Sequence, residues 1–145
     1  MPANYDKDLR TIVRMIELIR EVDGEMPLQM AHTFFCIALK PGSSMQELVT
    51  QTGLAQSSIS RNVQALSRWH WQRDRETKLP KDGYNLVEAA DDPTDSRRKI
   101  IYLTPKGRTL ASKVISAIRG EKVELEAPTA KEAVRSIFNK AAAAR

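Results

Sequence analysis

The chain has 145 residues and a formal net charge of +5, and 41% of its residues are hydrophobic. This length suits one compact domain, or a small domain with appended helices. A single cysteine excludes an internal disulfide, and no N-terminal apolar run has the length of a signal peptide or a membrane span, so we expect a cytoplasmic protein.

The first predicted element is an amphipathic helix over residues 5–22. Its apolar side chains recur at helical spacing, and they are Leu9, Ile12, Ile16 and Ile19. The dense apolar segment Met30–Leu39 then predicts a buried helix that contains Cys36. We expect this cysteine to be a core thiol rather than an oxidant sensor, because its neighbours are apolar.

Two short helices joined by a tight turn are predicted between Ser44 and Leu66. Ser44 and Glu47 form an S-x-x-E capping box that starts the first helix, and Gly53 ends it. The buried stripe of the second helix consists of Ile59, Val63 and Leu66. Its remaining polar side chains are Gln56, Ser57, Ser58, Ser60, Arg61, Asn62 and Gln64. This pattern is typical of a helix-turn-helix.

The second helix of this pair has side chains that can read DNA. Arginine matches guanine, glutamine and asparagine match adenine, and serine matches several base edges in the major groove. The helix has no acidic residue, and the segment Gln56–Lys81 has six basic residues against two acidic ones. Such a basic excess is typical of a phosphate-contacting surface. The alternative is an ordinary solvated helix, because helix-turn-helix geometry also occurs in proteins that never bind DNA.

A two-stranded hairpin is predicted next, with strands Tyr84–Ala89 and Lys99–Leu103 and the polar loop Ala90–Arg98 between them. A hairpin directly after a helix-turn-helix predicts a winged helix, whose tip can lay basic side chains along DNA. Thr104 and Pro105 then start a further helix, as its N-cap and its first residue.

Two C-terminal helices have apolar stripes that a winged helix does not need for its own core. The first stripe consists of Leu110, Val114 and Ile118. The second helix starts at the capping box Thr129–Glu132, and its stripe consists of Val134, Ile137 and Phe138. Both stripes need another apolar surface, which is provided either by the same chain or by a second copy.

The segment from Asp92 to Arg108 resembles the wing and the following helix start of the MarR family of bacterial transcriptional regulators. The family pattern is D-P-x-D-x-R, a hydrophobic strand and then L-T-x-x-G, which is matched by Asp92, Pro93, Asp95, Arg97, Leu103, Thr104 and Gly107. The resemblance implies that Arg97 reaches DNA while Asp95 holds it in place. The alternative for this pair is a surface salt bridge of little consequence. The resemblance also implies a homodimer whose terminal helices interlock, and a small aromatic effector.

The chain departs from the family pattern in three places, one of which is Val49, where helix-turn-helix proteins usually have a small residue in the first helix. Ala55 stands where a serine or threonine normally caps the recognition helix, a loss of about 1 kcal/mol. The segment Ser67–Lys81, which contains Trp69 and Trp71, is inserted before the wing. It is either a longer recognition helix ending in a loop, with its tryptophans on the core or wing, or an extra contact to the DNA backbone or a partner.

The predicted fold class is α+β and mostly helical, a winged helix-turn-helix with N- and C-terminal dimerisation helices. We expect residues 27–104 to form a DNA-binding lobe, and residues 5–22 and 105–145 to form a dimerisation region. The expected function is sequence-specific binding of a pseudo-palindromic duplex by a homodimer, as a MarR-like transcriptional regulator that represses. The predicted DNA-binding residues are Gln56, Ser57, Ser58, Ser60, Arg61, Gln64, Arg68, Arg97, Arg98 and Lys99.

Two other functions remain open at this point: a winged helix of replication, partition or phage assembly, and a protein-interaction winged helix. An enzyme is not expected, because His32 and His70 are far apart in unrelated contexts. Moreover, the sequence has no metal-ligand spacing, no phosphate-binding glycine loop and no distinct Ser/His/Asp arrangement. We therefore expect no cofactor, no metal and no membrane partner.

Overall fold

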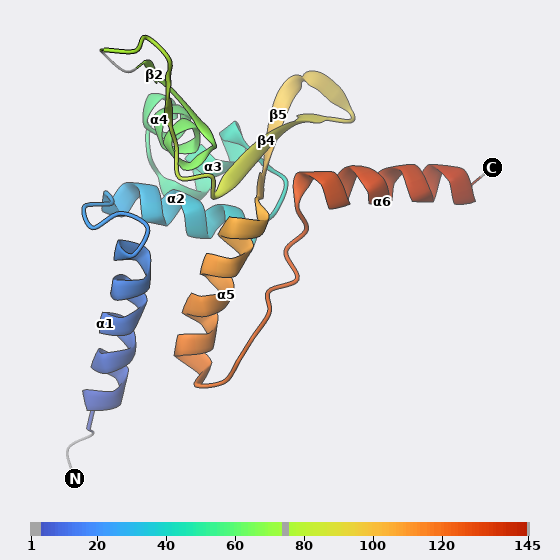
Figure 1. The fold of residues 1–145 in the computed structure, drawn as a ribbon. Coiled ribbons are helices and arrows are strands. Elements are labelled where there is room, and N and C mark those ends of the chain that lie inside the picture. The colour runs from blue at the N-terminus through green and yellow to red at the C-terminus, as the bar shows by residue number, and fades with distance from the viewer. Residues whose placement is uncertain (1–3, 74–75, 145) are drawn as a thin grey trace.

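The computed structural model describes residues 4–73 and 76–144, which form six helices and two small antiparallel sheets (Figure 1). In chain order the helices are α1 (Asp6–Arg20), α2 (Leu28–Leu39), α3 (Met45–Thr52), α4 (Gln56–Leu66), α5 (Pro105–Arg119) and α6 (Ala130–Ala143). The strands are β1 (Ser43–Ser44), β2 (Trp69–Arg73), β3 (Pro80–Asp82), β4 (Val87–Asp92) and β5 (Asp95–Leu103). These elements confirm the predicted fold class, α+β and mostly helical.

The hydrophobic core lies where α2, α3 and α4 meet the three-stranded sheet β1–β5–β4. Its fully buried side chains include Phe34, Ile37, Leu48, Ile59, Leu66, Leu86, Val87, Ile101 and Leu103. Cys36 on α2 packs against this core while remaining partly exposed, and burial raises the pKa of its thiol. A raised pKa favours the protonated thiol, which is the less reactive form.

The joint between α3 and α4 forms where local sequence signals predict it. The Ser44 hydroxyl accepts a hydrogen bond from the backbone N–H of Glu47 at 3.1 Å, which starts α3. Gly53 ends α3 in the left-handed conformation at φ 72°, where a side chain would be strained. Ala55 occupies the N-cap of α4 and has no side-chain oxygen to offer. The predicted helix-turn-helix is confirmed.

The hairpin formed by β4 and β5, with its tip at Pro93 and Thr94, is the wing. Its first strand begins at Val87 rather than Tyr84, because Asn85 has a left-handed backbone at φ 56° that interrupts extended structure. The predicted loop Ala90–Arg98 is wrong, since strand pairing continues to Asp92 and resumes at Asp95. The turn is this short because the Asp92 carboxylate accepts hydrogen bonds from the Thr94 amide at 2.9 Å and hydroxyl at 2.7 Å.

A third strand, β1, completes the wing sheet and was not predicted from the sequence. Ser43 pairs with Ile101 and Ser44 with Ile100 in antiparallel register. The two serines lack the β-branched or aromatic character that indicates strands. They are nevertheless buried, and the Ser43 hydroxyl donates to the carbonyl of Lys40 at 2.6 Å. Pairing with β5 rather than intrinsic propensity makes this segment extended.

The segment between α4 and the wing forms a second hairpin, β2–β3, which we call the inserted hairpin (residues 68–82). The alternative of a longer recognition helix is wrong, because α4 ends at Leu66 and Ser67 is extended at ψ 174°. Strands β2 and β3 pair antiparallel, with Trp69 opposite Asp82. The side chains of Trp69 and Trp71 lie outside the described part of the structure, so their predicted packing stays a prediction.

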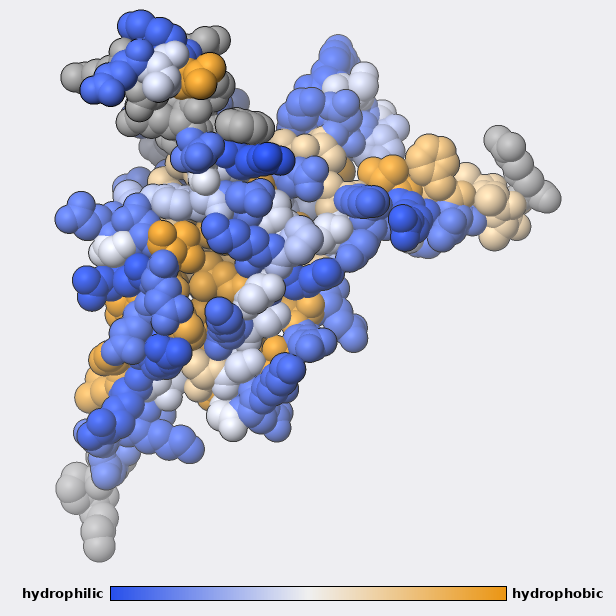
Figure 2. Space-filling model, viewed as in Figure 1, coloured by the Kyte–Doolittle hydropathy of each residue, from blue (hydrophilic) through white to orange (hydrophobic). Residues whose placement is uncertain are grey.

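The terminal helices leave apolar side chains exposed. Helix α1 packs beside α5, whereas α6 extends away from the body of the molecule (Figure 1). The capping box Thr129–Glu132 that starts α6 is confirmed, with both of its hydrogen bonds present. Figure 2 shows hydrophobic side chains gathered along α6. The exposed apolar residues of α1 and α6 are Leu9, Ile12, Val13, Ile16, Val134, Ile137 and Phe138.

None of the helices in residues 4–73 and 76–144 combines the length and apolar character that a membrane crossing needs.

Candidate nucleic-acid interface

Helix α4 divides its side chains between the core and the surface. Its buried stripe is the predicted one, Ile59, Val63 and Leu66. Among the predicted DNA-binding residues of this helix, Gln56, Ser57 and Arg61 are exposed, while Ser58, Ser60 and Gln64 are half-buried. Arg68, just beyond the helix, is exposed as well. The first two turns of α4 therefore present the freest polar surface.

Asn62 does not belong to this exposed face. It is 9% exposed, and its amide nitrogen donates to the Thr33 hydroxyl at 3.1 Å and to the Gln29 carbonyl at 3.4 Å. Asn62 thus ties α4 to α2 inside the protein. Gln64 is also partly drawn in, since its side-chain oxygen is buried with no hydrogen-bond partner among the described residues. Asn62 lies three residues after the buried Ile59 and next to Val63, so helical spacing could have placed it on the buried side of α4.

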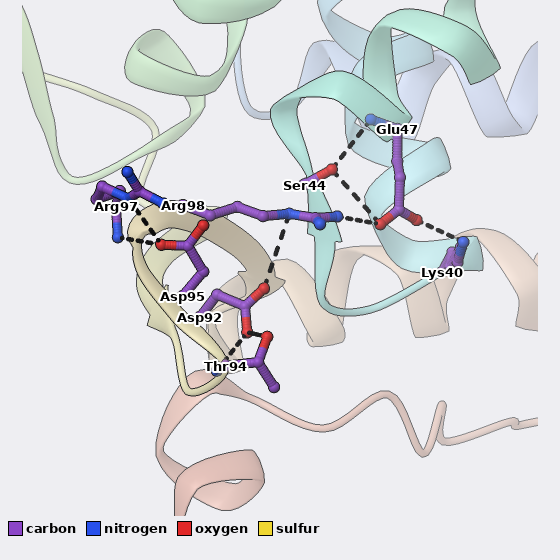
Figure 3. Close-up of polar contacts among 8 residues, drawn as sticks. All are labelled: Lys40, Ser44, Glu47, Asp92, Thr94, Asp95, Arg97 and Arg98. Carbon is purple, nitrogen blue, oxygen red and sulfur yellow. Dashed lines mark hydrogen bonds and ion pairs between the residues drawn. The ribbon is translucent and has the colours of Figure 1, made fainter.

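The basic side chains of the wing are each paired with a carboxylate of the same chain, and Figure 3 shows the pairs of Arg97 and Arg98. Arg97 bonds to Asp95 at 3.2 Å, and the same carboxylate accepts from the Arg97 amide at 3.1 Å. The predicted contact between Asp95 and Arg97 is therefore present. The side chain of Arg97 is nevertheless 90% exposed. Lys99 pairs with Asp91 across the hairpin.

Arg98 turns back toward the helix-turn-helix rather than outward. Its guanidinium bonds to the Glu47 carboxylate at 2.9 Å and lies 3.7 Å from Asp92, and its side chain is 48% exposed (Figure 3). Glu47 also accepts from Lys40, at the end of α2. The hydrogen bond from Lys40, together with the positive charges of Lys40 and Arg98, holds the pKa of Glu47 below its ordinary value although burial opposes this. These contacts attach the wing to the start of α3.

The start of α5 is fitted tightly beneath the wing. The Thr104 hydroxyl donates to the Asn85 carbonyl at 2.6 Å and accepts from the Gly107 amide at 3.1 Å, so it joins two elements. A Cβ at Gly107 would lie 2.0 Å from the Leu86 carbonyl oxygen. The L-T-x-x-G part of the motif therefore has a structural reason: only glycine allows α5 to approach this backbone.

A cleft of about 280 Å³ lies between α1 and α5, beside the base of the wing. Leu18, Leu86 and Leu110 give it apolar walls, and its charged lining residues are Glu21, Lys106 and Lys113. Among the described residues, no group of three or more His, Cys, Asp and Glu side chains is placed to hold a metal ion.

The comparisons with known proteins rest on structure, because no protein-family model and no curated protein matches the sequence. RV1404 from Mycobacterium tuberculosis aligns over 78% of this chain and 67% of its own, with a TM-score of 0.57 and 20% identity. MepR from S. aureus, solved as a complex with DNA, aligns over 95% and 91%, with a TM-score of 0.56 and 17% identity. The chain has the MarR-type winged-helix fold.

A third structure agrees with this fold. The PcaV transcriptional regulator from Streptomyces coelicolor aligns over 94% of this chain and 90% of its own, with a TM-score of 0.51 and 20% identity. The alignments with MepR and PcaV span almost the whole length of both proteins, so the MarR-type fold includes the terminal helices as well as the winged helix. The predicted resemblance is thus confirmed for the fold.

Proposed function

We propose that this protein binds double-stranded DNA sequence-specifically as a MarR-like transcriptional regulator, acting as a repressor in the cytoplasm. The observation that carries the proposal is the free polar face of α4, where Gln56, Ser57 and Arg61 are exposed on a helix without acidic residues. Support comes from the shared fold of MepR, which has been solved with DNA. In this fold a recognition helix enters the major groove and the wing follows the backbone or the minor groove.

The roles of the side chains follow from their exposure. Gln56, Ser57 and Arg61 contact base edges, because they lie on the open side of the recognition helix. Arg97 binds phosphate from the wing, since its side chain is 90% exposed. Arg98 is paired with Glu47, so its role is to fix the position of the wing rather than to bind phosphate.

The functional protein is a homodimer in this proposal. The exposed apolar side chains of α1 and α6, among them Ile16 and the 70% exposed Phe138, lie outside the winged helix and form the contact between two copies. Residues 27–104 act as the DNA-binding lobe, and residues 5–22 and 105–145 as the dimerisation region. A two-fold dimer places two recognition helices about 34 Å apart, so the half-sites are roughly ten base pairs apart on a pseudo-palindromic duplex.

The cleft between α1 and α5 is the proposed place for a small aromatic effector. Its leucine walls suit an aromatic ring, and Lys113 among its lining residues suits a carboxylate. Because Leu86 lies at the base of the wing, a bound ring contacts both the terminal helices and the DNA-binding lobe. A screen of aromatic acids by thermal shift, with DNA release as the second readout, tests this part of the proposal.

Selection of bound duplexes from a random DNA pool, followed by affinity titration against salt, tests the DNA-binding function. Enrichment of a two-fold site with the predicted spacing supports a sequence-specific dimer. Steeply salt-dependent binding without an enriched sequence would instead favour an assembly role in replication, partition or phage biology. Absence of binding would favour a protein partner.

A matched pair of variants places the base contacts. Arg61→Gln removes one cation from α4, and Arg119→Gln removes one from the exposed end of α5. We expect Arg61→Gln to lower the preference for the selected site, at a cost of about 1–3 kcal/mol in binding. Arg119→Gln should leave both sequence preference and affinity almost unchanged. Equal effects would show that α4 is not the recognition helix.

A further inference from the structure

The inserted hairpin lies against the recognition helix. Strand β2 contacts α4, and in Figure 1 the inserted hairpin and the wing rise on the same side of the molecule, with α3 and α4 between them and α1 and α5 pointing away. A duplex that contacts both α4 and the wing would therefore also pass close to the inserted hairpin.

The inserted hairpin is added to the winged helix without replacing any part of it. Its two ends are joined at the base, where the Gly83 amide donates to the Arg68 carbonyl at 2.8 Å. The Tyr84 amide then donates to the Ala65 carbonyl at 3.0 Å, and the Leu86 amide to the Leu66 carbonyl at 2.7 Å. The chain thus leaves the end of α4 and returns to the same place before the wing begins.

The two hairpins differ in charge. The inserted hairpin has five basic and three acidic residues, whereas residues 87–103 of the wing have three basic and four acidic ones. The inserted hairpin therefore has a net charge of +2 and the wing a net charge of −1, so the inserted hairpin adds positive charge beside α4 that attracts phosphate.

We propose that the inserted hairpin is a second wing, which binds the phosphate backbone of the same duplex that α4 reads. This inference rests on the proposed DNA-binding function and adds a contact surface to it. Phosphate contacts fix the position of a protein on DNA but do not read its sequence. The second wing therefore raises the affinity for all duplexes alike and increases the dependence of binding on salt.

The test compares two double variants of the full chain. Arg73→Gln with Lys81→Gln removes two cations from the inserted hairpin, and Arg119→Gln with Lys122→Gln removes two from the end of α5 and the residues that follow it. Each lost phosphate contact lowers the slope of log affinity against log salt by about 0.9. We expect the hairpin variant to lose about 1.8 in slope, which makes the fall in affinity between about 50 and about 200 mM salt about tenfold smaller.

The expected result also includes an unchanged sequence preference in the hairpin variant and an unchanged slope in the α5 variant. The single variant Lys78→Gln, at an exposed turn position, keeps the test decisive if the double variant unfolds, and its slope should fall by about 0.9. If the hairpin variants bind like the wild type, the second wing is wrong while the DNA-binding function stands. If the wild type binds no duplex at any salt concentration, both are wrong.

Discussion

The two hairpins beside α4 are attached to the protein in different ways. The wing is part of the core sheet: β5 pairs with β1 and β4, Ile101 and Leu103 are fully buried, and Arg98 is bonded to α3. The inserted hairpin is joined to α4 by backbone hydrogen bonds at its base. The position of the wing is therefore set by the core sheet, whereas that of the inserted hairpin is set by its base on α4.

The largest expected effect concerns the base of the inserted hairpin. A Cβ at Gly83 would lie 1.8 Å from the Ser67 carbonyl oxygen, so Gly83→Ala must displace the backbone there. We expect the free energy of unfolding to fall by on the order of 3 kcal/mol. Gly24→Ala is the matched control, because a Cβ at Gly24 meets nothing within 4 Å. Equal melting curves for the two variants would show that the hairpin base is not closely packed.

A smaller effect is expected at Tyr84, which follows the inserted hairpin and donates a hydrogen bond to Asp23 in the turn after α1. Tyr84→Phe removes this bond and should cost about 1.5 kcal/mol, measured by chemical denaturation. Burial and the hydrogen bond to Asp23 raise the pKa of Tyr84 to about 12. Because the raised pKa favours the protonated form, this stabilisation is complete below the ordinary value of 10.0 and is lost as the pH rises towards 12.

A pH titration followed by tyrosine absorbance checks the Tyr84 assignment. The wild type should show one more late-ionising tyrosine than Tyr84→Phe, in which burial still raises the pKa of Tyr102. The stability difference between the two proteins should also shrink above pH 10. A difference that stays constant through alkaline pH would contradict the proposed role of the hydrogen bond.

The attachment of the wing to α3 should contribute less. A double-mutant cycle with Glu47→Gln and Arg98→Gln is expected to give a coupling energy of about 0.5 kcal/mol, because both side chains are partly exposed. The lowered pKa of Glu47 means that this coupling is present above its ordinary value of 4.5 and is lost as the pH falls below it. Coupling that persists at strongly acidic pH would exclude an ionic attachment.

The smallest effect is expected on DNA binding by the wing. Glu47→Gln releases Arg98 towards phosphate and should steepen the slope of log affinity against log salt by at most about 0.9. Glu88→Gln is the control, since it removes one exposed carboxylate from the wing without breaking an ion pair described above. If both variants bind DNA alike, the effect is one of net charge, and Arg98 is not held back by Glu47.

Local signals predicted the helix ends, and long-range contacts could not be predicted. The capping contacts of Ser44, Gly53, Thr104 and Thr129 lie within four residues, so the sequence pattern alone located α3, α5 and α6. Glu47 and Arg98 are 51 residues apart, and nothing in the local pattern of either residue indicates the other. The wing motif was recognised in the sequence, but the carboxylates that pair with its basic side chains could be identified only from the structure.

Strand β2 could have been predicted from the sequence. The alternation Trp69-His70-Trp71 is typical of a strand, and aromatic residues favour extended structure. The interpretation as an extended recognition helix failed because Ser67 ends α4, with its hydroxyl and amide both bonded to the Val63 carbonyl, at 2.6 and 3.0 Å. Strand β1 is different, because its two serines become extended only by pairing with β5.

Hydrogen–deuterium exchange of the full chain, with and without a mixed-sequence duplex at low salt, tests most directly whether α4 and its flanking hairpins form a DNA-binding surface. We predict slower exchange in peptides from α4 and residues 68–82 when DNA is bound, a weaker effect at the wing tip, and no change in α5. Protection confined to α1, α5 and α6 in the presence of bound DNA would contradict this assignment.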